Sequence, residues 1–172
     1  PWMTDDEVDY LQRPGNAEAL YVIQVEKKES GVETEMDLYY TADGILVKEI
    51  ADVEKDNDYH DYLPQTPSDA ISAWLTQNYP GARMVDMERE HNSTEIEFVH
   101  GGLKYEAVFD SSGQWVYTKT DLGRNYSRLV PEVVLSALTG KYSTGEWRVD
   151  DAEEFLSATN HYYCFELERI RS

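Results

Sequence analysis

The strongest constraint on the fold is a pattern that recurs along the chain. Gly15, Gly81 and Gly145 each follow a segment typical of a helix end, and their spacings are 66 and 64 residues. After each glycine come short segments of alternating apolar and polar residues separated by turns, which is typical of antiparallel strands. Self-similarity of this kind predicts repeated supersecondary units. We expect one domain made of three units, at residues 1–60, 61–125 and 126–172.

The middle unit shows the pattern most completely. Thr66 is suited to cap a helix whose first residue is Pro67. Ile71, Trp74 and Leu75 then fall on one face at helical spacing, which places Trp74 in the core. Four alternating segments follow, at residues 83–90, 95–100, 104–110 and 114–119. The prediction is an α+β fold in which helices pack on one face of a curved antiparallel sheet built from helix-plus-meander repeats.

The outer units contain parts of the same pattern. Leu129-Val130-Pro131 opens a second predicted helix, with strand candidates at residues 147–150 and 162–167 after it, so the third unit is truncated. Upstream, Asp9–Gly15 is similar to Leu75–Gly81, which ends the middle helix. The first unit is therefore expected to begin with the remnant of a degenerate helix.

This arrangement resembles the PepSY-like family of β-lactamase-inhibitor-like exported bacterial proteins. The resemblance rests on Asn78–Ala82 leading into Val85–Glu88, on the hairpin Tyr105–Val116, and on its earlier counterpart Leu38–Gly44. It implies a protein of the periplasm or cell envelope, or a secreted one, that binds other proteins and inhibits a hydrolase or peptidase. The family brings no catalytic, cofactor-binding or metal-binding residues to carry over.

Charge excludes several classes of partner. The 172 residues include 34 acidic and 15 basic side chains, a formal net charge of −19 at pH 7. Nucleic-acid binding needs clustered Lys and Arg, and an anionic membrane surface repels such a chain. No apolar run approaches the roughly 20 residues of a membrane span. We expect no nucleic-acid partner and no membrane insertion. Nothing at the start is typical of a signal peptide, so if the protein is exported, we expect this chain to be its processed part.

Catalytic and metal-binding patterns are missing from the sequence. Its four histidines show no ligand spacing, no nucleophile or phosphate-loop motif occurs, and Cys164 is expected to be a small side chain on a strand. We therefore expect no enzyme and no cofactor. Alternating carboxylates between residues 52 and 61 suggest a calcium loop, but the turn glycine is missing, so a solvated connector is preferred. These carboxylates are Asp52, Glu54, Asp56, Asp58 and Asp61.

Strand alternation predicts an acidic face that contains tyrosines. Met36, Leu38 and Tyr40 are expected to point toward the helices, and the alternate residues to point away. An uncovered sheet face is polar for solubility alone, but acidic charge with tyrosines also suits docking of a basic protein surface. The candidate partner-binding face consists of Glu33, Glu35, Asp37, Tyr39, Glu106, Tyr162 and Glu166.

Three functions fit these observations. The first is an exported protein-binding module, with the acidic face as its docking surface. The alternative is a small-molecule or carbohydrate-binding accessory protein of the cell envelope, in which Tyr and Trp rings stack on a sugar. The third is a purely structural accessory domain. The first is preferred because the resemblance favours it and no spare aromatic cluster is evident outside the predicted core.

Overall fold

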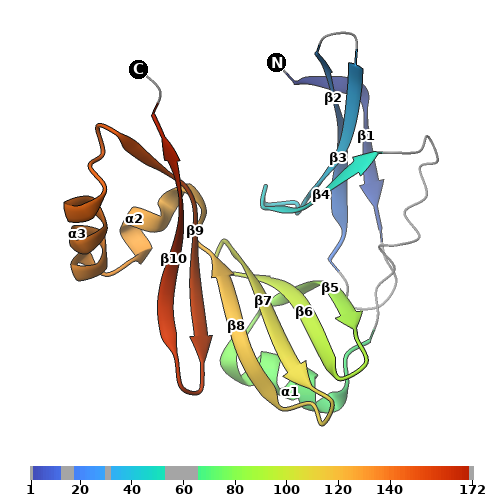
Figure 1. Cartoon of the computed structure of the whole chain (residues 1–172). Coiled ribbons are helices and arrows are strands. Elements are labelled where there is room, and N and C mark those ends of the chain that lie inside the picture. The colour runs from blue at the N-terminus through green and yellow to red at the C-terminus, as the bar shows by residue number, and fades with distance from the viewer. Residues whose placement is uncertain (1, 13–17, 30–31, 53–65, 171–172) are drawn as a thin grey trace.

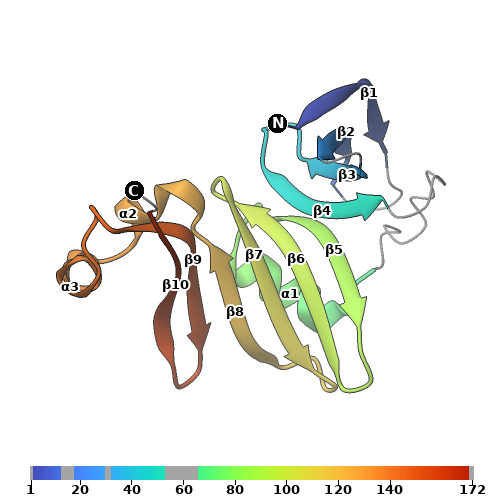
Figure 2. The ribbon, with the colours of Figure 1, turned by 45° about the horizontal axis from the view of Figure 1, so that its top comes forward.

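The computed structural model describes residues 2–12, 18–29, 32–52 and 66–170, and its strands form two antiparallel sheets (Figures 1 and 2). The N-terminal sheet has the order β1-β2-β3-β4, and the larger sheet has the order β10-β9-β8-β7-β6-β5. The α+β class with antiparallel strands is confirmed, although the strands form two sheets where the sequence suggested one.

The smaller sheet contains β1 (Met3–Leu11), β2 (Leu20–Glu29), β3 (Val32–Tyr40) and β4 (Leu46–Asp52). The larger contains β5 (Arg83–Arg89), β6 (Ser93–His100), β7 (Leu103–Asp110), β8 (Trp115–Asp121), β9 (Trp147–Ser157) and β10 (His161–Arg169). The helices are α1 (Asp69–Asn78), the 3₁₀ turn η2 (Gly123–Asn125), α2 (Tyr126–Leu129) and α3 (Glu132–Lys141). No helix in the described part of the chain has the length and apolarity needed to cross a membrane.

Helix α1 begins two residues later than the sequence suggested. Ser68, and not Thr66, is the N-cap, because its backbone is extended and its hydroxyl accepts a hydrogen bond from the Ile71 amide at 3.4 Å. An N-cap oxygen must reach an amide two or three residues ahead, and Thr66 lies too early to do so. The helix ends at Asn78 with Tyr79 as its C-cap, and Gly81 then has φ +81°, a left-handed conformation that favours glycine.

The apolar face of α1 packs on β5–β8, as the sequence predicted. Ile71 is buried, and the fully buried Phe98 and Phe109 lie on the strands beneath the helix. The indole of Trp74 lies edge-on to Phe109 at 5.0 Å between ring centroids and stacks on Trp115 at 6.1 Å. These ring contacts join α1 to the last two strands of the meander, β7 and β8.

Helices α2 and α3 pack on the same side of the larger sheet, against β9 and β10. Leu122, Val130 and Ala152 form the buried centre of this layer, and Leu135 and Phe165 pack around it. The predicted helix after Pro131 is confirmed as α3. The sequence did not indicate η2 or α2, because elements of three and four residues are too short to show a hydrophobic period.

The first unit begins with a strand and not with the remnant of a helix. Residues 9–11, whose sequence is similar to the end of the middle helix, lie in β1. There Val8 is opposite Ile23 and Tyr10 is opposite Tyr21. The rings of Tyr10 and Tyr21 lie 5.1 Å apart. Pairing with β2 satisfies the backbone of this segment, so cross-strand contacts override its local similarity to a helix end.

The N-terminal sheet packs against the β5–β6 end of the larger sheet through a core of its own. Tyr39 is only 3% exposed there, in contact with a cluster that includes Val47 on β4, Val85 on β5 and Val99 on β6. The sequence predicted the opposite alternation, with Met36, Leu38 and Tyr40 buried. That prediction is wrong because the covering layer is the second sheet and not a helix, and it lies on the Tyr39 side of β3.

Charged groups surround this contact between the sheets. The guanidinium of Arg83 donates to Glu18 and to Asp43, each at 2.8 Å, and Lys48 pairs with Asp86 at 3.1 Å. A backbone hydrogen bond from Glu18 to Met84 adds a direct link at 3.1 Å. These bonds fix the orientation of the contact, whereas apolar burial provides most of its stability.

We predict that Trp74→Ala lowers the free energy of unfolding by about 3 kcal/mol or more, because it removes the ring that joins α1 to β7 and β8. Urea unfolding followed by far-UV circular dichroism measures this loss. The matched control is Val133→Ala on α3, whose side chain is 76% exposed and whose loss should change stability by about 0.5 kcal/mol at most. Equal effects of the two substitutions would contradict the role given to Trp74.

Candidate functional site

One face of the larger sheet carries no helix from the described part of the chain, and we call it the open face. On β6 the buried Ile96 and Phe98 point toward α1, so Glu95, Glu97 and Val99 point the other way. The cross-strand register extends this face over the neighbouring strands. Its charged residues include Asp86, Glu88, Glu95, Glu97, Lys104, Glu106, Lys119, Asp121, Asp151, Glu153 and Glu166.

The N-terminal sheet covers one end of the open face. Val99 is fully buried in the core between the sheets, and the ammonium of Lys104 donates to the carbonyl of Val47 at 2.8 Å. In Figure 2 the strand β4 runs across the end of the larger sheet that carries β5 and β6. The part of the open face that stays free of the N-terminal sheet therefore lies on β8, β9 and β10.

Three rings form a continuous stack across that free part. Tyr117 on β8 lies 5.1 Å from Phe155 on β9, and Phe155 lies 4.7 Å from Tyr162 on β10, with interplanar angles of 28° and 13°. Tyr162 is 51% exposed. The ammonium of Lys119 lies 5.7 Å from the centroid of the Tyr117 ring. We call Tyr117, Phe155 and Tyr162 the ring stack.

A polar hollow of about 120 Å³ lies beside the ring stack, between β7 and β9. Lys119 and Glu106 form an ion pair in its wall at 3.0 Å, and this hydrogen bond raises the pKa of Lys119. Carboxylates dominate the rest of the wall. Asp151 and Glu153 form no ion pair with any other described residue. The hollow is therefore acidic, because its carboxylates outnumber the lysines that line it.

Crowding of carboxylates changes their protonation. Burial, together with Glu106, Glu97 and Glu88, raises the pKa of Glu95 from 4.5 to about 7. Burial is also the main cause that raises the pKa of Glu97, whose Oε2 atom is buried without a hydrogen-bond partner in the described part of the chain. The open face thus holds negative charge that its own lysines do not neutralise.

The structure brings together only part of the predicted partner-binding face. Glu106, Tyr162 and Glu166 lie on the open face, where Glu166 is exposed. Glu35 and Asp37 lie half-buried on β3 of the other sheet.

Two further residues of the predicted face give different outcomes. Tyr39 is buried between the sheets and is unable to contact a partner. The side chain of Glu33 lies outside the described residues. Sequence reasoning missed Phe155 and Glu153 because it ended the strand at residue 150, although the alternating segment runs on to Ser157.

The remaining chemical candidates are few. Cys164 is exposed on β10. Among the described residues no group of His, Cys, Asp or Glu side chains is arranged to hold a metal ion. Glu54, Asp56, Asp58 and Asp61 lie outside the described residues, as does the side chain of Asp52, so the predicted connector stays a prediction.

Comparison with known proteins finds a matching family model and similar solved structures. A family model described as "Putative beta-lactamase-inhibitor-like, PepSY-like" matches residues 54–104 and 92–169. A crystal structure of a BLIP-like protein from Bacteroides fragilis is 27% identical, with a TM-score of 0.52, and the match covers 65% of this chain and 77% of that one. A search of curated proteins finds no match.

We predict that Glu95→Gln raises the melting temperature at pH 8 by about 2 °C and leaves it unchanged near pH 5. A carboxyl whose pKa rises on folding, here from 4.5 to about 7, stabilises the fold at low pH, and this stability is lost as the pH rises through 7. The amide avoids that loss. Thermal unfolding at both pH values measures the effect.

The control is Glu166→Gln, which removes the same charge from an exposed position on the same face. It should give a smaller difference between the two pH values. A gain for Glu95→Gln of equal size at pH 5 and pH 8 would show that titration of this carboxyl is not its cause.

Proposed function

This chain belongs to the PepSY-like, β-lactamase-inhibitor-like family, and on that basis we propose that it is an exported, non-enzymatic protein-binding module whose open face docks a basic protein. The periplasm or cell envelope, or secretion, is part of the same proposal. The observation that carries it is the ring stack, a partly exposed aromatic surface beside Asp151, Glu153 and Glu166, which form no ion pair with a described residue.

Aromatic side chains make effective contact points in protein interfaces. Tyr and Phe bury a large area for the loss of only two side-chain torsions, and they recur among residues that dominate binding energy. The ring stack is already ordered by its own contacts at 4.7 and 5.1 Å, so little further entropy is lost on binding. Phe155 forms the centre of the stack, and Tyr162 gives its most accessible surface.

The charges around the ring stack favour a basic partner. Lys104 is already bonded to Glu97, and Lys119 to Glu106, so both lysines of the open face are engaged. Asp151, Glu153 and Glu166 have no ion-pair partner among the described residues. Arg or Lys side chains on the partner would relieve this repulsion and would speed the first encounter.

The inhibitory role is the more specific part of the proposal. The family description supports it, since it refers to inhibitors of β-lactamase, an enzyme class. We propose that the partner is a hydrolase or peptidase with basic residues near its active site, and that docking on the open face blocks access of substrate.

We predict that Tyr162→Ala weakens partner binding by about tenfold or more, mainly through faster dissociation. Glu153→Gln combined with Glu166→Gln should instead slow association and reduce the dependence of binding on salt. The immobilised chain first captures its partner from an envelope extract of the source bacterium. Surface plasmon resonance at two salt concentrations then gives both rates.

The matched control is Glu132→Gln combined with Glu146→Gln, which removes two charges from the helical side of the chain. This control should bind like the unmodified protein, and melting curves should show that every variant is folded. Assays of the captured enzyme with its substrate test inhibition. Unchanged binding of Tyr162→Ala and of the double variant together would exclude the open face as the interface.

A further inference from the structure

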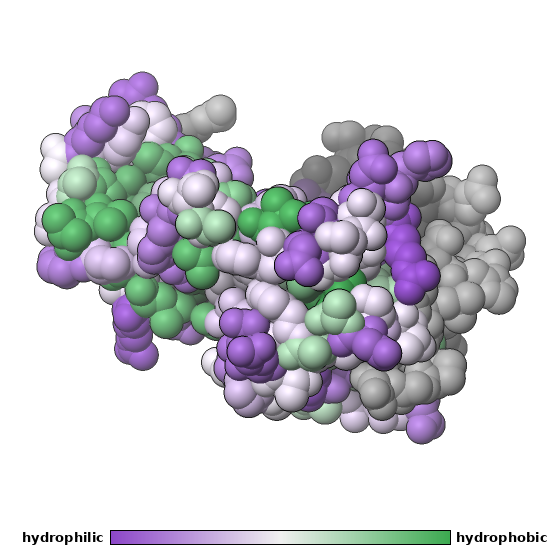
Figure 3. Space-filling model, turned by 90° about the horizontal axis from the view of Figure 1, so that it is seen from below, coloured by the Kyte–Doolittle hydropathy of each residue, from purple (hydrophilic) through white to green (hydrophobic). Residues whose placement is uncertain are grey.

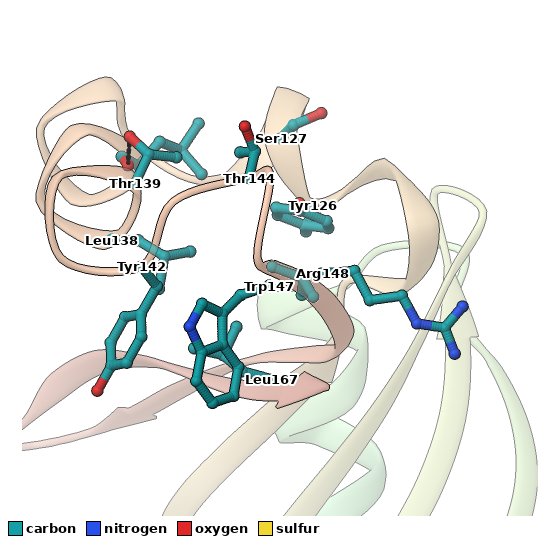
Figure 4. Close-up of a pocket in the computed structure, with 11 residues that line it drawn as sticks. Tyr126, Ser127, Leu138, Thr139, Tyr142, Thr144, Trp147, Arg148 and Leu167 are labelled. Carbon is teal, nitrogen blue, oxygen red and sulfur yellow. Dashed lines mark hydrogen bonds between the residues drawn. The ribbon is translucent and has the colours of Figure 1, made fainter. Parts of the chain in front are cut away.

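A second site lies on the opposite side of β9 and β10 from the ring stack. Helices α2 and α3 leave a cavity of about 390 Å³ above these strands (Figure 4). Pockets for small molecules begin at about this size. Three aromatic side chains and several leucines form most of its lining. They are Tyr126, Tyr142, Trp147, Leu135, Leu138 and Leu167.

The helix over this cavity is incompletely packed. No residue of α3 is fully buried, and Val133 on its outer side is 76% exposed. Figure 3 shows apolar surface at the left end of the molecule, where α3 lies in Figure 1. An apolar surface of this kind gains free energy when a ligand displaces water from it.

The cavity also offers two polar groups that form no hydrogen bond within the described part of the chain. Tyr142 and Trp147 lie edge to face at 5.8 Å, side by side in Figure 4. Neither the indole nitrogen of Trp147 nor the hydroxyl of Tyr126 has a hydrogen-bond partner in the described part of the chain. Each can donate one hydrogen bond to a ligand acceptor.

The charge around the cavity is opposite to that of the rest of the chain. Residues 122–149 carry four basic and two acidic side chains, within a protein of net charge −19. Arg128 follows the lining residue Ser127, and the ammonium of Lys141 lies 5.3 Å from the centroid of the Tyr142 ring. Neither Arg128 nor Lys141 forms an ion pair with a described residue, whereas Arg148 is held by Glu168 and Asp150.

We propose that this cavity binds a small organic anion, with an apolar ring or chain between α3 and the sheet and its acidic group beside Lys141. Apolar lining, unused donors and local positive charge all favour this chemistry over a neutral or cationic ligand. The site does not depend on the protein-binding role of the open face, because its side chains point to the other side of the strands.

Calorimetric titration of the whole chain tests the proposal. Naphthalene-2-acetate is the anionic probe and naphthalene-2-acetamide is its neutral match. We expect one saturable site for the acid and affinity about tenfold lower for the amide. Lys141→Gln should reduce the affinity for the acid to that for the amide, whereas Lys28→Gln, on the N-terminal sheet, should change nothing.

Nuclear magnetic resonance of the tryptophan indole groups locates the bound probe in the unmodified protein. The four tryptophans give four indole resonances in a ¹⁵N spectrum, and Trp147→Phe identifies one of them. Only that resonance should shift strongly during titration with the acid. Competition by decanoate would assign the site to acyl chains as well, whereas failure to compete would restrict it to acids that carry rings.

Three results would overturn the proposal. They are the absence of saturable binding by both naphthalene-2-acetate and decanoate, equal affinity for the acid and the amide, and a shift confined to another indole resonance. Leu138→Trp, designed to fill the cavity, gives an independent check where its melting curve shows a folded protein. Retention of full affinity in that variant would also exclude the cavity.

Discussion

The packing of the helices on one side of the six-stranded sheet determines where every other surface of the protein lies. Trp74 holds α1 on β7 and β8 through its contacts with Phe109 and Trp115, and α2 and α3 continue the same layer over β9 and β10. Because side chains alternate along a strand, burial of one set of residues under the helices exposes the other set. The acidic open face is therefore a direct consequence of the aromatic core behind it.

The contact between the two sheets then limits how much of that face is accessible. Tyr39 and Val99 bury the β5–β6 end, and Lys48 and Lys104 place cations next to Asp86 and Glu97 there. These cations offset part of the desolvation of Glu97, whose pKa nevertheless stays raised by burial. At the β8–β10 end no described strand of the N-terminal sheet covers the larger sheet, and Asp151, Glu153 and Glu166 form no ion pair with a described residue. The unpaired carboxylates and the ring stack therefore lie together on β8–β10, because the N-terminal sheet covers only the β5–β6 end of this face.

The sequence predicted the parts of the fold that depend on local pattern. The apolar period around Trp74 and the alternation around Phe98 and Phe109 were sufficient to place α1 and β5–β8 correctly. The N-terminal sheet was predicted less well, because residues 9–11 become a strand only through pairing with β2, and the side of β3 that is buried depends on which layer covers it. The same limit applies to the candidate site. Glu106, Tyr162 and Glu166 follow from alternation, but the ring stack requires the register between three strands, which residue spacing does not reveal.

The two candidate sites share the hairpin of β9 and β10, yet they use different residues of it. On β10, Tyr162 and Glu166 point to the open face, whereas Phe165 and Leu167 point to the helical layer. The register shift between Glu166 and Leu167 falls where the strand passes from the ring stack toward the cavity, and it places Leu167 opposite Val149. Because strand residues alternate with a period of two, a substitution at Tyr162 changes one surface and leaves the lining of the other intact. The geometry therefore allows protein binding and small-molecule binding to be separated by single substitutions on one strand.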